Sequence, residues 1–439
     1  MTTKDNENSK SVETQEHGSA AFRKEYIAHD LQAGVITATM AIPLSIGIAL
    51  MSDYPIQVGL ATVAFASFIG FLFAWFRPGN FIGAPGIAAG LAPILAMGVA
   101  TFGIENMAFI IFMTATFQAL IWKYNWQRYL LKAVPTYLVE GLLAGIGLKI
   151  ALKFLPFLWM LPVGMTAPEE FWNADRITVI VLSLAGAAVF LTLFKMYKDT
   201  KPAMPYFALI ILGIVASQFF EVNMLKVEDV DFVLGLPIPD FNTAYMWMYA
   251  IFFALMLAVV DVIEQVMSNA AIEKIDPLDR PCNSNNSLLS IWVSNMGASF
   301  FGGMTNLDGL AKSSTNRLAG AYTKLSVLVI GLMITFFVLN SQYLDHLPYF
   351  ALAIIMIFVG VKMIMGLLHV AQFGPYALLL GSLCGILVFL VGIFEGLLIT
   401  LALHAIINYV IFTKIENKSA GAVVRQYFSR FKDDETNIN

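Results

Sequence analysis

The chain has 439 residues, of which 58% are apolar and only 13% are charged, and its mean hydropathy is +0.74. Soluble domains contain about 45–50% apolar and about 25% charged residues, so this composition argues against a water-soluble enzyme, a secreted disulfide-rich protein or a nucleic-acid binder. One membrane crossing takes about 20 apolar residues. The apolar stretch over residues 26–412 therefore predicts roughly 13 to 15 crossings and excludes a single-span receptor.

The two ends of the chain differ from its apolar body. Residues 1–28 are polar and predict a cytoplasmic tail, and the apolar run that follows is too long for a cleavable signal peptide. We expect one transmembrane transporter domain over residues 29–412, followed by a short cytoplasmic tail over residues 413–439. The cysteines Cys282 and Cys384 lie far apart in the sequence, which predicts two free thiols and no disulfide framework.

Apolar runs separated by Gly, Pro and charged residues predict an all-α polytopic membrane protein with fourteen transmembrane segments. We expect these segments at about 30–51, 56–76, 83–99, 104–123, 129–155, 177–195, 203–221, 244–272, 285–303, 307–318, 322–341, 347–366, 373–392 and 394–412. The third and tenth segments are short for a complete crossing.

The distribution of charge predicts the orientation. If both termini are placed inside, the inside loops carry nearly all Lys and Arg residues, and the outside loops carry only Arg176 and Lys226 among many acidic residues. Cytoplasmic loops are expected to hold the positive excess. The pattern therefore predicts an even number of crossings, two cytoplasmic termini and a multi-pass protein of the plasma (inner) membrane.

The sequence also has a weak internal symmetry. Two segments, residues 82–90 and 302–312, are short and interrupted by Gly or Pro, and aligning Ile82 with Thr305 gives an offset of 223 residues. The first and eighth spans begin at a similar offset, which predicts two halves of seven spans each. An odd number of spans per half makes the repeats inverted. Broken helices at matching positions in two halves are the best sequence indication of a transporter's binding site.

A helix that begins inside the membrane exposes unpaired N–H groups and the positive end of its dipole, so it can bind an anion. We expect Pro85 and Gly86 in the first turn of one half-helix, and Asn306 or Asp308 as the cap of the other. The predicted substrate-binding residues are Ala84, Pro85, Gly86, Ile87, Gly309, Leu310, Ala311 and Lys312. The alternative is that Gly and Pro here only allow close packing of helices.

The eighth span carries a polar stripe, because Asp261, Glu264, Gln265 and Ser268 follow the spacing of one helix face. Ionisable groups at this depth are costly and must face a cavity, a partner or a cation. We predict a coupling-ion site formed by Glu264, Asp261, Ser268 and Asp308, with Na⁺ held at Glu264 and Asp308 or a proton held by the paired carboxyls. Lys312 would be the counter-charge. The alternative is a structural ion-pair network.

Other chemistry has no support in the sequence. It contains no metal-ligand spacing, no phosphate-binding loop and no ordered Ser/His/Asp set. The sequence therefore predicts neither an enzyme nor an ATP-driven pump, and no cofactor beyond Na⁺ or H⁺ as coupling ion.

Several motifs resemble the sulfate permease (SulP) family of anion transporters in their order and spacing. They lie at residues 30–35, 41–50, 83–91, 236–240, 295–303, 312–316 and 319–320, together with Glu264. The resemblance implies a core domain (about 29–123 and 244–341) moving against a gate domain (about 129–221 and 347–412). It also implies a small anion bound between half-helices three and ten, and a homodimer.

Three features depart from the family pattern. The tail is too short for the cytoplasmic STAS domain that usually follows. Lys312 stands where the family usually has Arg, and Lys lacks the bidentate fork for oxyanions. Asp308 stands where Gly or Ser is typical, and Asp261 is an additional acid. Added negative charge beside an anion site favours a coupling cation or weakens the preference for anions.

We therefore predict a secondary active transporter of a small inorganic anion, bicarbonate or sulfate, coupled to Na⁺ or H⁺ and working by alternating access. One alternative is a nucleobase–H⁺ symporter of the same architecture, in which Glu264 and Asp308 would bind a neutral ring. A second is a passive anion channel, and a third is a membrane scaffold without transport. The expected partners are the anion, the lipid bilayer and a second copy of the chain.

Overall fold

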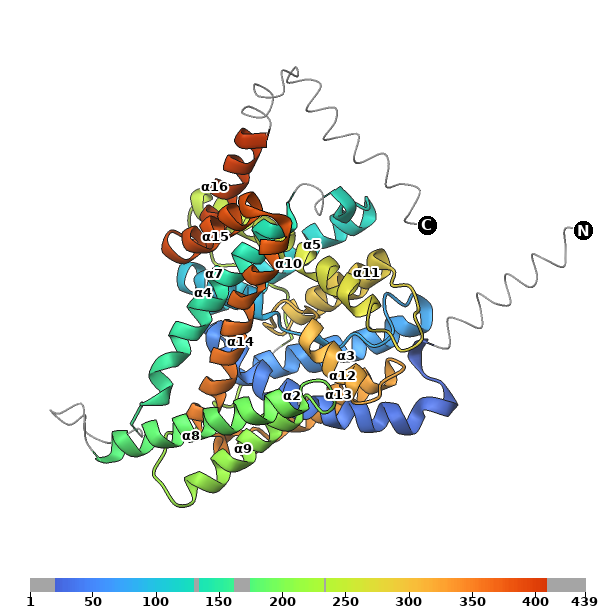
Figure 1. Cartoon of the computed structure of the whole chain (residues 1–439). Helices are drawn as coiled ribbons and strands as arrows, with labels where there is room; N and C mark the ends of the chain where they lie inside the picture. The colour runs from blue at the N-terminus through green and yellow to red at the C-terminus, as the bar shows by residue number, and fades with distance from the viewer. Residues whose placement is uncertain (1–19, 130–133, 162–173, 233, 409–439) are drawn as a thin grey trace, which may run out of the picture. The chain divides into compact units, whose positions relative to one another are not determined.

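The computed structural model describes residues 20–129, 134–161, 174–232 and 234–408, and these residues are predominantly helical (Figure 1). Most of the two expected tails lies outside the described residues. The helices are α2 (Ile27–Met51), α3 (Ile56–Phe76), α4 (Ala92–Phe102), α5 (Ile104–Lys123), α7 (Thr136–Phe154), α8 (Ala174–Tyr197), α9 (Met204–Ser217), α10 (Ala244–Glu273), α11 (Ser284–Ser299), α12 (Leu310–Leu318), α13 (Leu325–Leu339), α14 (Tyr349–Val370), α15 (Pro375–Leu390) and α16 (Ile393–Ile406).

Each of the fourteen expected spans contains one of these helices, which confirms the all-α architecture. The bounds of α3 and α5 are those expected from the sequence. Within the described residues, seven helices are long and apolar enough to cross a membrane by length and composition, and five further apolar helices have 10–17 residues. The fifth span was expected from residue 129, whereas α7 begins at Thr136, because Pro135 disfavours helical backbone in the residue before it.

The third and tenth spans are broken in the structure. A two-residue strand β1 (Pro85–Gly86) and a short 3₁₀ turn η2 (Ala89–Leu91) precede α4. A second strand, β2 (Leu307–Asp308), precedes α12. The helices themselves have only 11 and 9 residues, about half of what a crossing takes. Both are therefore half-helices, as the sequence predicts.

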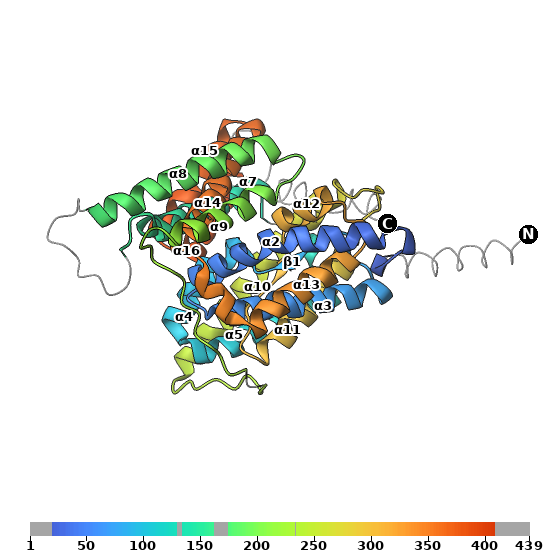
Figure 2. The ribbon, with the colours of Figure 1, turned by 90° about the horizontal axis from the view of Figure 1, so that it is seen from below.

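The chain forms two compact units, and the first comprises residues up to 125 and 152–357. In this unit α13 packs along α2 and α3, which Figure 2 shows running side by side. A Cβ at Gly34 would meet the side chain of Val329, and a Cβ at Gly331 would meet Ser67. Small residues thus let the three helices approach closely, as is common in membranes. Of the two strands, β1 packs on α3 and β2 packs on α10.

The second unit comprises residues 126–151 and those from 358 onward. Its helices pack by the same device, since a Cβ at Gly141 would meet the main-chain oxygen of Gly381, and one at Gly147 would meet that of Gly360. These two units are defined by packing alone, so the division into core and gate domains inferred from the sequence stays a prediction.

Candidate substrate and coupling-ion site

The two broken spans meet through their strands. β1 and β2 pair antiparallel, with Pro85 opposite Asp308 and Gly86 opposite Leu307. The ladder is extended by a hydrogen bond from Gly309 N to Ala84 O (3.1 Å). The offset of 223 residues found in the sequence aligns Pro85 with Asp308, and these two residues are partners in the ladder.

Two details of the sequence interpretation are wrong. Pro85 and Gly86 lie in β1 and not in the first turn of a helix, and the helical backbone begins only at Ala89. The cap residue of α12 is Gly309, which offers no side chain, so neither Asn306 nor Asp308 caps it. Pairing between the two broken spans holds the backbone extended before each helix starts. Capping signals are local in the sequence, so they cannot reveal that pairing with a distant segment competes with helix formation.

The pairing brings two helix N-termini to one place in the unit. Neither η2, which leads into α4, nor α12 has a side-chain cap at its first turn. Their first N–H groups and the positive ends of their dipoles are therefore free of a capping side chain and suited to an anion. Ile87 is buried, whereas Leu310 and Ala311 in the first turn of α12 are exposed. All eight predicted substrate-binding residues lie on the two broken spans.

Lys312 lies next to β1. Its side chain is 2% exposed, and its Nζ donates to Ser45 Oγ of α2 at 3.3 Å. A Cβ at Gly86 would collide with Lys312 Nζ. The missing side chain at Gly86 is thus what lets the ammonium approach the β1 backbone. Lys312 makes no ion pair within the part of the chain that the structure describes, so its charge is available to an anion.

The four polar residues of the α10 stripe have two different roles. Gln265 Oε1 accepts from Asp308 N (2.8 Å), Gln265 Nε2 donates to Ser287 Oγ (2.6 Å), and Ser268 Oγ donates to the main-chain oxygen of Asp308. These two side chains hold β2 in place. Asp261 and Glu264 do not contact β2 through any such bond in the described chain.

Asp261 is fully buried and lies in a network of amides. Its Oδ2 accepts from Gln118 Nε2 at 2.6 Å and from Asn295 Nδ2 at 3.4 Å, while its Oδ1 has no hydrogen-bond partner. Glu264 Oε2 is also buried and has no partner in the described structure. Neither acid makes an ion pair among the described residues. Two carboxyl groups three residues apart on one helix face therefore remain to be neutralised by a proton or a cation.

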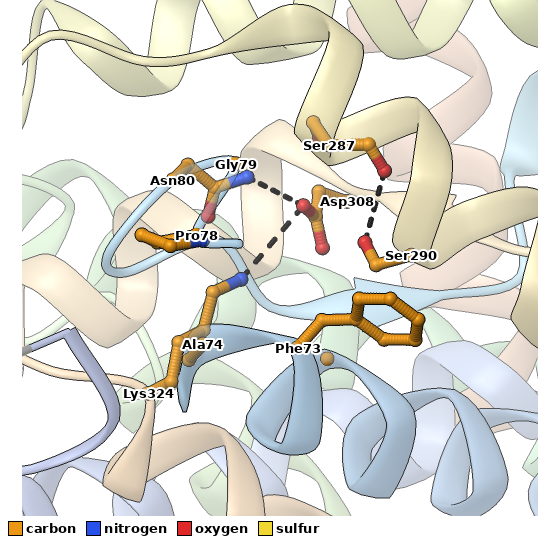
Figure 3. A pocket seen from close by; sticks show the side chains of 10 residues that line it. Phe73, Ala74, Pro78, Gly79, Asn80, Ser287, Ser290, Asp308 and Lys324 are labelled. Atoms are coloured by element: carbon orange, nitrogen blue, oxygen red, sulfur yellow. Dashed lines mark hydrogen bonds and ion pairs between the residues drawn. The ribbon is translucent and has the colours of Figure 1, made fainter. Parts of the chain in front are cut away.

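Asp308 faces a different part of the unit. Its Oδ2 accepts from Asn80 Nδ2 at 2.6 Å and lies 3.8 Å from Lys324 Nζ (Figure 3). Lys312 was the expected counter-charge of the acidic residues, but Lys324 is the ammonium that lies beside Asp308. Within the described residues, Asp308 contacts the stripe through its main chain, whose N–H donates to Gln265 and whose oxygen accepts from Ser268. Sodium at Glu264 and Asp308 stays a prediction, and the described residues contain no cluster of three His, Cys, Asp or Glu side chains suited to a metal.

Sequence reasoning missed four polar residues that build this region: Asn80, Gln118, Asn295 and Lys324. Gln118 and Asn295 interrupt apolar spans, and a search for every polar residue inside a span would have found them. Asn80 and Lys324 lie at span ends, where polar residues are ordinary, so the sequence carries no signal for their contacts with Asp308.

The cysteine expectation is confirmed, because Cys282 and Cys384 are both free thiols. Burial, reinforced by the nearby Glu273 carboxylate, raises the pKa of the Cys282 thiol to about 12. The thiol therefore stays protonated at neutral pH and has little of the thiolate character that reactivity or metal binding requires.

Comparison with known proteins agrees with this architecture. Residues 27–376 match the model of the Sulfate permease family. The chain is 25% identical over 350 residues to the putative sulfate transporter YvdB of Bacillus subtilis (strain 168), covering 76% of this chain and 64% of the relative. It is 27% identical over 344 residues to the putative sulfate transporter YbaR of the same strain, covering 76% and 66%. The chain thus spans slightly less than two thirds of these relatives.

Solved structures show the same fold. The transmembrane domain of a cyanobacterium bicarbonate transporter, BicA, superposes with a TM-score of 0.70 at 19% identity, over 87% of this chain and 98% of that one. The murine Solute Carrier 26 family member A9 anion transporter in its inward-facing state gives 0.69 at 17% identity, over 89% and 69%. The fold is therefore that of a multi-pass membrane protein with two inverted repeats of seven helices.

The family match covers most of the chain. The protein accordingly belongs to the sulfate permease family, and the resemblance seen in the sequence motifs is confirmed.

Proposed function

We propose that this protein is a secondary active transporter of a small inorganic anion, bicarbonate or sulfate, coupled to Na⁺ or H⁺. The main observation behind the proposal is the antiparallel pairing of β1 with β2, which we call the strand crossing. Two half-helices without side-chain caps begin there, beside the Lys312 ammonium, which has no ion-pair partner among the described residues. Membership of the sulfate permease family supports the transport of an anion. The names of the solved bicarbonate transporter and of the putative sulfate transporters supply the two substrates to test.

The anion would bind at the crossing through main-chain N–H groups of residues 84–87 and 309–311, with Lys312 balancing its charge. Helix dipoles and N–H groups hold an anion in place without discriminating strongly among anions. Because Lys312 supplies a single compact charge, oxyanion orientation would depend on the backbone and not on a bidentate side chain.

The coupling ion would bind at the α10 stripe. Glu264 and Asp261 supply two buried carboxyl oxygens that have no partner among the described residues, and Ser268 and the main-chain oxygen of Asp308 would supply neutral oxygens. Oxygen ligands of this kind suit a hard cation, and two neighbouring carboxyl groups also favour holding a proton. The protein would work by alternating access as a homodimer in the plasma membrane, with both termini cytoplasmic as the Lys and Arg distribution predicts.

Uptake of labelled bicarbonate and labelled sulfate into proteoliposomes, with and without an inward Na⁺ gradient and at two pH values, tests the proposal. Bicarbonate uptake that needs Na⁺ would support a sodium site at the stripe, and sulfate uptake that follows a proton gradient would support a proton carrier. Uptake of neither anion under any gradient would overturn the proposal, and binding of uracil or xanthine would then favour nucleobase transport. Conductance independent of Na⁺ and pH would instead favour a channel.

A further inference from the structure

A ring of four residues closes one end of the strand crossing, and we name Asn80, Gly83, Asp308 and Lys324 the Gly83 clasp. Gly83 N donates to Asn80 Oδ1 (2.8 Å), and Gly83 O accepts from Lys324 Nζ (2.6 Å). Asn80 Nδ2 and Lys324 Nζ both face Asp308 Oδ2, at 2.6 Å and 3.8 Å. The clasp therefore joins the backbone that leads into β1 to the only charged side chain of β2.

The crossing consequently lies between two buried ammonium groups. Lys312 lies against Gly86 and Lys324 against Gly83, and both residues are less than 5% exposed. Only Lys324 has a carboxylate partner within the described residues, and that partner is Asp308. Figure 3 shows the Asp308 carboxylate directed toward Lys324 and Asn80 at the edge of a small cavity.

The Asp308 carboxylate neutralises positive charge that a substrate anion would otherwise neutralise. Without Asp308, two uncompensated ammonium groups would flank the crossing, and a doubly charged anion would match them. With Asp308, one uncompensated ammonium remains, and a singly charged anion matches it. Asp261 and Glu264 on α10 lie outside the clasp, so their charges are the same with and without the Asp308 carboxylate.

We propose that Asp308 is a charge-selectivity residue, which neutralises Lys324 and thereby makes the crossing prefer a singly charged anion such as bicarbonate over a doubly charged one such as sulfate. This inference rests on the proposed anion site at the crossing and adds the residue that sets the charge class of its substrate.

The size of the effect can be estimated from the spacing of the two glycines that the lysines contact. Gly83 and Gly86 are three residues apart, which is about 10 Å of extended chain. A unit charge at that distance, in an effective dielectric of about 20, changes the affinity for a monovalent anion roughly tenfold and that for a divalent anion by about the square of that factor. Removing the charge of either Asp308 or Lys324 should therefore change the ratio of sulfate affinity to bicarbonate affinity about tenfold.

The test is a charge series measured by isothermal titration calorimetry on the full chain in lipid nanodiscs, with sodium bicarbonate and sodium sulfate at pH 8 and equal ionic strength. Asp308→Asn, which keeps the acceptor and frees Lys324, should raise the sulfate-to-bicarbonate affinity ratio about tenfold. Lys324→Gln, which leaves Asp308 uncompensated, should lower the ratio by a similar factor. The double variant Asp308→Asn/Lys324→Gln removes both charges and should restore the wild-type ratio.

The double variant separates charge from packing. If it shifts the ratio as far as a single variant does, or if Asp308→Asn leaves the ratio unchanged, the clasp acts only through structure and the inference is overturned. Asp308→Ser and Lys324→Gln keep the series complete if Asp308→Asn does not fold, since each predicts a shift of known sign. Wild-type protein that binds neither anion would instead overturn the proposed function itself, an outcome distinct from binding with an unchanged ratio.

Discussion

The strand crossing and the acidic pair on α10 lie in the same compact unit but differ in how their polar groups are satisfied. At the crossing, Gln265, Ser268 and Asn316 each make hydrogen bonds to the backbone or side chains of a broken span or its neighbours. On α10, Asp261 Oδ1 and Glu264 Oε2 are buried and have no hydrogen-bond partner in the described parts of the chain. Buried polar groups that are paired hold a structure together, whereas an unpaired buried carboxyl lowers stability unless an ion or proton joins it. Hydrogen bonds from Gln265, Ser268 and Asn316 thus hold the crossing in shape, whereas Asp261 and Glu264 keep carboxyl oxygens that a cation or proton can bind.

The largest effect is expected from Glu264→Gln. Because the Glu264 Oε2 atom has no partner among the described residues, removing its charge takes away no bond that this part of the structure shows. We expect an unchanged or higher melting temperature and ion-coupled uptake reduced to background in proteoliposomes. Glu105→Gln, at an exposed acid in the first turn of α5, is the matched control and should transport normally. Full gradient-driven uptake by Glu264→Gln would contradict the assignment of Glu264 to binding of the coupling ion.

Lys312→Met sharpens the comparison, because Lys312 belongs to the crossing but its ammonium makes only a long hydrogen bond, to Ser45, within the described chain. A unit charge at about 4 Å in an effective dielectric of about 20 is worth about 4 kcal/mol. Part of this is offset by desolvation, so we expect anion affinity to fall at least about a hundredfold while the melting temperature is retained, as measured by calorimetry and thermal unfolding. Lys153→Met, which removes a half-exposed ammonium paired with Asp53, is the control and should bind anions like the wild type.

If Lys312→Met does not fold, Lys312 is needed for the structure and not only for anion binding. Unchanged anion affinity in a folded variant would remove it from the substrate site.

Asn316→Ala tests the framework with the smallest expected effect. Asn316 is fully buried, and its Nδ2 donates to Ile82 O (3.0 Å) and Ser326 Oγ (2.8 Å). Its loss leaves the carbonyl of Ile82 unpaired, which should lower the free energy of unfolding by about 1–3 kcal/mol and lower the melting temperature in detergent. Asn340→Ala, at the half-exposed end of α13, should cost less than about 0.5 kcal/mol. Equal melting temperatures for the two variants would contradict a framework role for Asn316.

The sequence predicted most of the fold and about half of the site. Long apolar runs predicted most of the helices, because a membrane span must satisfy its backbone internally and is therefore helical wherever it is apolar and long enough. The short, polar α12 was located instead by its match to the interrupted third span. The matched Gly- and Pro-rich segments and the acidic stripe were visible for a related reason, since interruptions and charges are rare within spans. Asp261 and Glu264 could be placed on one face by helical spacing alone.

Tertiary structure alone decided the partners of these residues. Sequence spacing could not show that Pro85 pairs with Asp308 in a strand, because the pairing joins residues more than two hundred positions apart and competes with local helix formation. Nor could it show that Lys324, and not Lys312, neutralises Asp308. The chain itself determined which side chains are buried in an apolar body. Which of their charges are cancelled and which remain for a ligand depends on distances between segments, and only the folded chain fixes those distances.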